Sequence, residues 1–148
     1  MTTNDAGNTV VTFEIREGLL WSDGEPITAD DFLFGHRIFG DTSTGTIARA
    51  NYPEVVESVE KVDDYTVVQT FNTVFPDYVS DGVYLQGRFP QHVIEPLMDA
   101  NGGSLDGLPY FTRGEGVVGY GPYIFDNWIP GESITFVPNP YWDGQEPA

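Results

Sequence analysis

Within residues 10–40, an alternating stretch, a turn and a capped helical stretch follow one another, and this succession most restricts the possible folds. The alternation has a period of two, which predicts a half-buried strand. Its apolar members are Val11, Phe13 and Ile15. The run 22–26, Ser-Asp-Gly-Glu-Pro, then predicts a turn. Thr28 provides an N-cap hydroxyl and Asp31 the third position of a capping box, so a helix is expected to begin there.

Two later pairs of stretches are each joined by turn residues, which predicts two antiparallel hairpins. They are 55–62 with 65–71 around Asp63-Asp64, and 123–128 with 133–137 around Pro130-Gly131. Short helices are expected at 75–87 and 93–100, and 101–121 is expected to be a glycine-rich loop. The predicted fold class is therefore α+β, with a mixed, mainly antiparallel sheet and a few packed helices.

The domain organisation predicted from this layout is simple. A chain of 148 residues corresponds to one domain. Residues 1–9 are polar and are expected to form a disordered leader, which leaves 10–148 as a single α+β lobe. The leader has no basic and apolar signal sequence, and no apolar run approaches the roughly 18 residues that span a bilayer.

The charge of the chain excludes several partners. Six basic against 23 acidic residues give a net charge of −17, and the acidic residues are scattered rather than grouped. Such a surface repels nucleic-acid phosphates and anionic membranes, so neither is expected as a partner. A solvated acidic surface that maintains solubility explains the charge better than a cationic ligand does. The absence of cysteine excludes disulfides and thiol catalysis.

Three segments resemble the extracellular solute-binding proteins of family 5, the oligopeptide- and dipeptide-binding components of ABC transporters. Residues 11–32 resemble the family's strand, W-S-D-G-x-P turn and helix. Residues 62–67 are similar to its hairpin turn, and 118–142 to its G-T-G-P-Y and N-P-x-Y-W segments. Residues 89–93 are similar to its P-K-H stretch. Two positions depart from the pattern, with Tyr120 and Gln91 replacing a small residue and a lysine.

The resemblance implies a function in solute capture. Family members are longer than this chain, so the segment resembles the additional lobe of a periplasmic-binding-protein-like fold (class II, cluster C). The intact protein is expected outside the cytoplasmic membrane, lipid-anchored, with its export signal outside this segment. Its expected partners are its own remaining lobes, a membrane permease, and a peptide or other small solute. No catalytic residue, cofactor or metal is implied.

Two groups of residues are singled out by these motifs. The first has turn-forming and packing functions that need no ligand. It comprises Trp21, Asp23, Gly24, Pro26, Thr28, Asp31, Gly119, Gly121, Pro122, Tyr123, Asn139, Tyr141 and Trp142. The second group consists of aromatic residues in the less regular middle of the chain, which are candidates for the edge of a ligand cleft. They are Tyr78, Tyr84 and Tyr110.

Other functions stay open at the level of sequence. An independent carbohydrate- or peptide-binding module is the main alternative, because a β-rich, aromatic and acidic domain is typical of such modules. A carboxylate-based hydrolase has less support, since some pair among 23 acidic residues always has a suitable separation. The two histidines, His36 and His92, are interpreted as surface or core residues, because no third metal ligand accompanies them.

Overall fold

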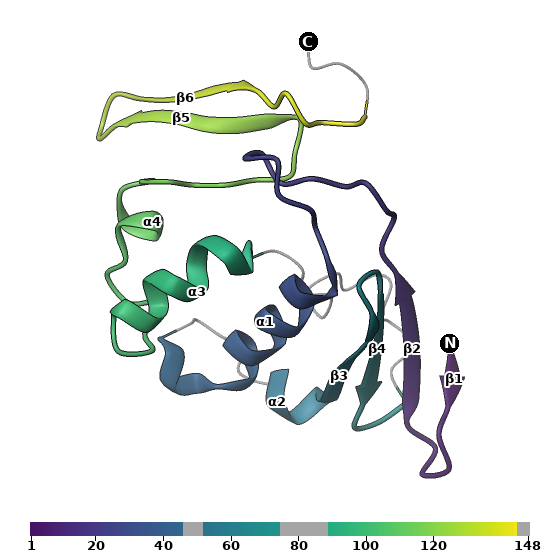
Figure 1. Cartoon of the computed structure of the whole chain (residues 1–148). Coiled ribbons are helices and arrows are strands. Elements are labelled where there is room, and N and C mark those ends of the chain that lie inside the picture. The colour runs from purple at the N-terminus through teal and green to yellow at the C-terminus, as the bar shows by residue number, and fades with distance from the viewer. Residues whose placement is uncertain (46–51, 75–88, 145–148) are drawn as a thin grey trace. The chain divides into compact units, whose positions relative to one another are not determined.

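The computed structural model describes residues 1–45, 52–74 and 89–144. The chain divides into two compact units (Figure 1). The first unit contains Met1–Glu17 and Thr28–Gln91, and the second contains Gly18–Ile27 and His92–Ala148. Each unit is therefore built from segments that are distant in sequence.

The first unit contains a four-stranded antiparallel sheet with the strand order β1-β2-β4-β3. Its strands are β1 (Thr2–Thr3), β2 (Thr9–Glu14), β3 (Val56–Asp63) and β4 (Thr66–Phe71). Val11 is buried in β2, whereas Thr12 and Glu14 are exposed. The alternation in the sequence therefore corresponds to the two faces of a strand.

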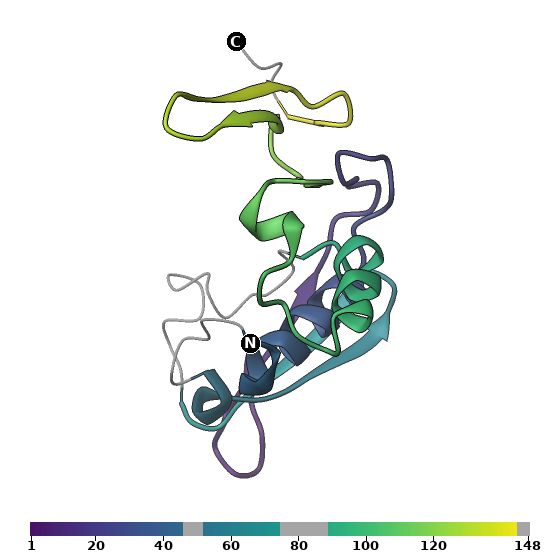
Figure 2. The ribbon, with the colours of Figure 1, turned by 90° about the vertical axis from the view of Figure 1, so that its left-hand side faces the viewer.

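Helix α1 (Ala29–Gly40) lies beside the sheet and contacts β3 and β4 (Figures 1 and 2). The short helices η1 (Thr42–Thr44) and α2 (Tyr52–Val55) follow it. The buried core of this unit joins strands and helices. One cluster of this core consists of Val11, Tyr52, Val56 and Phe71, with Phe13, Phe39, Val55 and Val59 packed against them.

The first hairpin differs from its prediction by one residue at the turn. Asp63 pairs with Thr66, so the connection is Asp64-Tyr65 rather than Asp63-Asp64. The Asp63 carboxylate accepts a hydrogen bond from the Tyr65 N–H at 2.9 Å. This local bond lets Asp63 remain in the strand and still fix the turn.

Residues 1–9 also differ from the predicted disordered leader, because the structure folds them into a hairpin. Thr2 pairs with Val10, and Thr3 pairs with Thr9. The Asn4 side-chain oxygen accepts from the N–H groups of Ala6 and Asn8 at 3.1 and 2.9 Å. A polar segment can therefore extend a sheet edge when an asparagine supplies the turn bonds.

The second unit contains two helices and a separate hairpin. Helix α3 (Gln91–Ala100) begins two residues before the predicted helix, with Gln91 itself in the first unit, and α4 (Pro109–Thr112) lies in the predicted loop. Strands β5 (Tyr123–Ile129) and β6 (Ser133–Pro138) form an antiparallel two-stranded sheet. Its turn contains Gly131, whose φ of 78° is in the left-handed region.

The predicted fold class is confirmed, because antiparallel sheets and a few helices make up the described chain. Both predicted hairpins are present. The helix predicted at 75–87 lies outside the described residues. The prediction of one lobe over 10–148 concerns the architecture of a larger protein and stays a prediction.

Candidate functional site

The Trp-Ser-Asp-Gly-Glu-Pro turn is closed by its own backbone. The Trp21 N–H donates to the Glu25 carbonyl oxygen at 2.8 Å, and the Gly24 N–H donates to the Trp21 carbonyl oxygen at 3.0 Å. Gly24 has a φ of 93°, which glycine adopts without steric cost. A Cβ at this position would lie 3.1 Å from Cζ of Tyr141, so glycine also permits a close contact.

The glycine-rich bend at 119–122 packs against this turn within the second unit. The Ser22 N–H donates to the Gly119 carbonyl oxygen at 2.7 Å, and the Gly119 N–H donates to Ser22 Oγ at 3.0 Å. The fully buried Trp21 ring meets Tyr120 edge to face, with 5.5 Å between the ring centroids. Two motifs 97 residues apart are thus joined by hydrogen bonds and an aromatic contact.

Asn139 connects the third motif to the same bend. Its side-chain Nδ2 donates to the Gly121 carbonyl oxygen at 2.9 Å, and its backbone N–H donates to the Pro122 carbonyl oxygen at 2.9 Å. Its Oδ1 accepts from the Tyr141 N–H at 2.9 Å. The Asn139 residue is only 5% exposed, and these bonds satisfy its amide.

These contacts define a motif cluster in the second unit. Its members are Trp21, Ser22, Gly24, Gly119, Gly121, Pro122, Asn139 and Tyr141. Pro26 closes the base of the turn through a bridge to Leu20, and the Trp142 N–H donates to the Asn139 carbonyl oxygen at 3.2 Å. Each hydrogen bond described here for the cluster has a backbone group as donor or acceptor.

Asp23 links this turn to helix α3. Its Oδ2 lies 2.7 Å from Nε2 of His92, and its Oδ1 accepts from the Glu25 N–H at 3.3 Å. Burial acts to raise the pKa of Asp23, but hydrogen bonds from His92 and from the Glu25 N–H outweigh it and hold the pKa below 3.8. A carboxyl with a lowered folded-state pKa stabilises the fold above about pH 4 and loses that contribution at lower pH.

Thr28 and Asp31 belong to the first unit, where they begin α1. The Thr28 side chain accepts from the Asp30 N–H, and the Asp31 carboxylate accepts from the Thr28 N–H at 3.0 Å. The other Asp31 oxygen accepts from the Gln91 N–H at 2.9 Å. The predicted capping box is therefore present, with aspartate in the usual place of glutamate.

Of the three tyrosines predicted at a ligand edge, only Tyr110 lies among the described residues. It is 8% exposed, and its hydroxyl donates to the Val118 carbonyl oxygen at 3.1 Å. Its ring packs edge to face on Phe111. Packing accounts for this arrangement, and contact of Tyr78, Tyr84 or Tyr110 with ligand stays a prediction.

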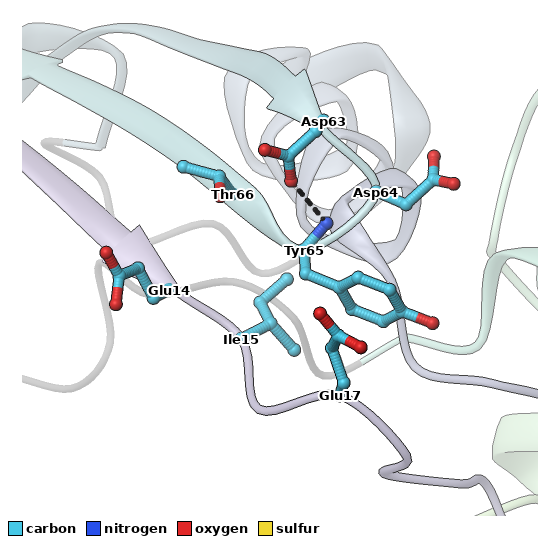
Figure 3. A pocket seen from close by; sticks show the side chains of 7 residues that line it. All are labelled: Glu14, Ile15, Glu17, Asp63, Asp64, Tyr65 and Thr66. Atoms are coloured by element: carbon cyan, nitrogen blue, oxygen red, sulfur yellow. Dashed lines mark hydrogen bonds between the residues drawn. The ribbon is translucent and has the colours of Figure 1, made fainter.

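An acidic hollow of about 430 Å³ lies at the end of the first-unit sheet (Figure 3). Seven residues line it: Glu14, Ile15, Glu17, Asp63, Asp64, Tyr65 and Thr66. Lys61 lies 2.8 Å from the Asp64 carboxylate and 2.9 Å from that of Asp30, which compensates part of the charge. Within the described ranges, no three His, Cys, Asp or Glu side chains are grouped to hold a metal ion.

His36 lies in the first unit beside the core. Its Nδ1 is 3.1 Å from the hydroxyl of Tyr52, which is fully buried. Burial lowers the pKa of His36 below its ordinary value of 6.5. The same cause raises the pKa of Tyr52. Both groups are therefore neutral near pH 7, and their contact is a hydrogen bond between uncharged partners.

This lowered pKa predicts a pH dependence of stability. The unfolded chain binds the His36 proton more tightly than the folded chain, so the free energy of unfolding is expected to fall as pH drops through 6.5 and to level off below the folded-state pKa. Urea unfolding of the parent and of His36→Gln, measured between pH 5 and 8, checks this. The free energy of unfolding of the variant should depend less steeply on pH than that of the parent. An equal pH dependence in both proteins would contradict the assignment to His36.

Comparison with known proteins identifies the family. Residues 2–148 match the model of the bacterial extracellular solute-binding proteins, family 5. The chain belongs to this family. Members are substrate-binding proteins of transport systems, and the family is extracellular or periplasmic. The resemblance found in the strand, turn and hairpin motifs is thereby confirmed.

Individual relatives agree with this assignment. Protein XP55 of Streptomyces lividans is 35% identical over 97% of this chain, and the periplasmic oligopeptide-binding protein OppA of Haemophilus influenzae is 33% identical over 91% of it. The crystal structure of Haemophilus influenzae OppA in complex with RPPGFSPFR superposes with a TM-score of 0.74 at 30% identity, covering 95% of this chain. The chain spans 24% of XP55, 26% of the OppA sequence and 29% of the OppA chain in the crystal structure, about a quarter of the length of each protein.

Sequence reasoning did not find two of the contacts described here. The Asp23–His92 pair joins residues 69 positions apart, and neither residue type is distinctive alone. The hydrogen bonds of Asn139 were also not foreseen, although its motif was. The Trp-Ser-Asp-Gly-Glu-Pro turn and the Asn-Pro-Tyr-Trp run were both assigned to family motifs, but that assignment did not predict that the two segments meet.

Proposed function

We propose that this chain is part of the substrate-binding component of an ABC importer for peptides or similar solutes. The observation that carries the proposal is the match to the family over residues 2–148, together with 30% identity to a structure solved in complex with RPPGFSPFR. The proposed work is differential binding between open and closed states, with no covalent chemistry.

In the intact protein, the solute would lie between lobes that close by a hinge motion, and a membrane permease would then receive it. The motif cluster suits a scaffold in such a protein, because its polar groups are engaged by neighbouring backbone. The protein would work outside the cytoplasmic membrane with a lipid anchor. Within the ranges that the structure describes, no helix is long and apolar enough to cross a bilayer.

An independent carbohydrate- or peptide-binding module is less consistent with the second unit. Such a module presents aromatic side chains on a completed sheet. The exposed aromatic residues on β5 and β6 instead lie on a sheet of two strands in the described chain. A two-stranded hairpin has little stability by itself in water, so this sheet requires further packing partners.

The proposal predicts peptide binding by the product of the complete reading frame that contains these residues. Isothermal titration with a mixed peptide library, followed by native mass spectrometry of the retained species, measures it. Binding should be at least about 100-fold weaker for residues 1–148 alone, a loss of about 2.7 kcal/mol. Equal affinity of the short and complete proteins, or catalytic turnover of the bound solute, would overturn the proposal.

A further inference from the structure

Register places the apolar side chains of the second hairpin on one side of it. Tyr123 pairs with Pro138, Phe125 with Phe136, and Trp128 with Ile134. A bulge between Phe125 and Asn127 adds one residue to β5, and this extra residue returns Trp128 to the side of Phe125. We call this side the ribbon face. Its six members are Tyr123, Phe125, Trp128, Ile134, Phe136 and Pro138.

The opposite side of the hairpin is mixed in character. Its pairs are Ile124 with Val137, Asn127 with Thr135, and Ile129 with Ser133. Since side chains alternate along a strand, these six residues point away from the ribbon face. The hairpin, shown as a two-stranded ribbon in Figure 2, therefore has one apolar side and one side of mixed character.

Much of the ribbon face is exposed. Ile134 and Phe136 are 56% and 57% exposed, and Trp128 is 41% exposed. A hollow of about 400 Å³ lies between the face and the α4 segment, and the face contributes Phe125, Trp128, Ile134 and Phe136 to its lining. The remaining lining residues are Tyr110, Phe111, Gly114 and Val117.

One end of this hollow is fixed by a backbone contact. A Cβ at Gly114 would lie 2.6 Å from Cζ of Phe125, so the chain passes directly against that ring. Phe125 also meets Phe136 edge to face, with 6.3 Å between centroids. The hollow is therefore bounded by positioned aromatic rings.

The charge distribution distinguishes this surface from the rest of the chain. The net charge is −17, yet none of the six residues of the ribbon face is charged, and neither is any residue from 133 to 142. An apolar surface of this kind, on a sheet that has two strands in the described chain, marks an interaction site. A second copy of the chain is a poor occupant, because it would bring another net charge of −17 close by.

We infer that the ribbon face is the docking surface for an apolar surface contributed by the remainder of the same polypeptide. The relatives XP55 and OppA are about four times as long as this chain, which spans 24% to 29% of them, so their additional residues can cover the ribbon face. This inference rests on the proposed function, since it requires that the chain be part of a larger binding protein.

Thiol labelling of the complete protein tests the inference with a matched pair of variants. Ile134→Cys lies on the ribbon face and Ile129→Cys on the opposite side of the same hairpin, and residues 1–148 contain no cysteine. Labelling rates follow thiol exposure. In the complete protein, Ile134→Cys should therefore react at least about tenfold more slowly than Ile129→Cys. Rates in urea give the intrinsic reactivity, and the parent rate is subtracted. In residues 1–148 alone, the two variants should differ by no more than about threefold.

A second measurement needs no substitution. Trp128 should be oxidised by hydroxyl radicals in residues 1–148 and be protected in the complete protein, as read by mass spectrometry. Equal labelling of the two thiols in the complete protein overturns the inference. Protection in residues 1–148 that grows with protein concentration also overturns it, in favour of a second copy. If peptides bind but the thiols react alike, only docking fails. If Ile134→Cys is protected but no solute binds, only the transport function fails.

Discussion

Replacing Trp21 by alanine is expected to lower the free energy of unfolding by about 3–5 kcal/mol. The indole is fully buried, and it packs edge to face on Tyr120. Alanine leaves a cavity that the hydrogen-bonded turn cannot close, because the backbone of Trp21 is tied to Glu25 and Gly24. The loss therefore combines the transfer term of a large side chain with a cavity term.

Urea unfolding followed by far-UV circular dichroism measures this effect without relying on tryptophan fluorescence. Trp128→Ala in residues 1–148 is the matched control, since its side chain is 41% exposed. The control is expected to change the free energy of unfolding by no more than about 1 kcal/mol. If Trp21→Ala and Trp128→Ala lower the free energy of unfolding equally, Trp21 does not anchor the turn as described.

Local signals in the sequence were sufficient for β2, the start of α1 and the two later hairpins. Alternation identified β2, and the turn residues identified both hairpins, because these features depend on neighbours within a few positions. The Thr28 cap and Asp31 likewise act within one helical turn. Such interactions are set by the local chain, so the sequence can be interpreted without knowing what packs on it.

The hairpin at residues 1–9 and helix α4 were not predicted, for a different reason. The hairpin contains mostly polar residues, and its pairing with β2 comes from an available sheet edge. Helix α4 spans four residues, Pro109–Thr112, which is too short for a periodic pattern. Neither element therefore has the hydrophobic periodicity on which a sequence prediction depends.

The candidate site shows the same division. Gly24 could be assigned to a turn from its residue type, and it has a positive φ, whereas Gly119 and Gly121 do not. The contact between Ser22 and Gly119 joins segments 97 residues apart and depends on how the second unit folds. The bulge that places Trp128 on the ribbon face could not be predicted either, because a single extra residue changes which side chains lie on the same side of the hairpin.

Replacing Asn139 by alanine is expected to lower the free energy of unfolding by about 2 kcal/mol. The change removes the Nδ2 bond to Gly121 and the Oδ1 bond from Tyr141, both 2.9 Å long. Asn139 is 5% exposed, so water has little access to replace them. Loss of partners for groups at a buried position costs more than the net value of the bonds themselves.

Two further variants separate this hydrogen-bonding function of Asn139 from packing. Asn139→Asp keeps the acceptor for Tyr141 but turns a carboxylate oxygen toward the Gly121 carbonyl oxygen, so it should be at least as destabilising as alanine at pH 7. Asn127→Ala, at an exposed position on β5, should have a free energy of unfolding within about 0.5 kcal/mol of that of the parent. Urea unfolding at pH 7 compares all three. An aspartate variant as stable as the parent would show that the Nδ2 donor contributes nothing, and the connection of Asn139 to the glycine-rich bend would then rest on its backbone N–H alone.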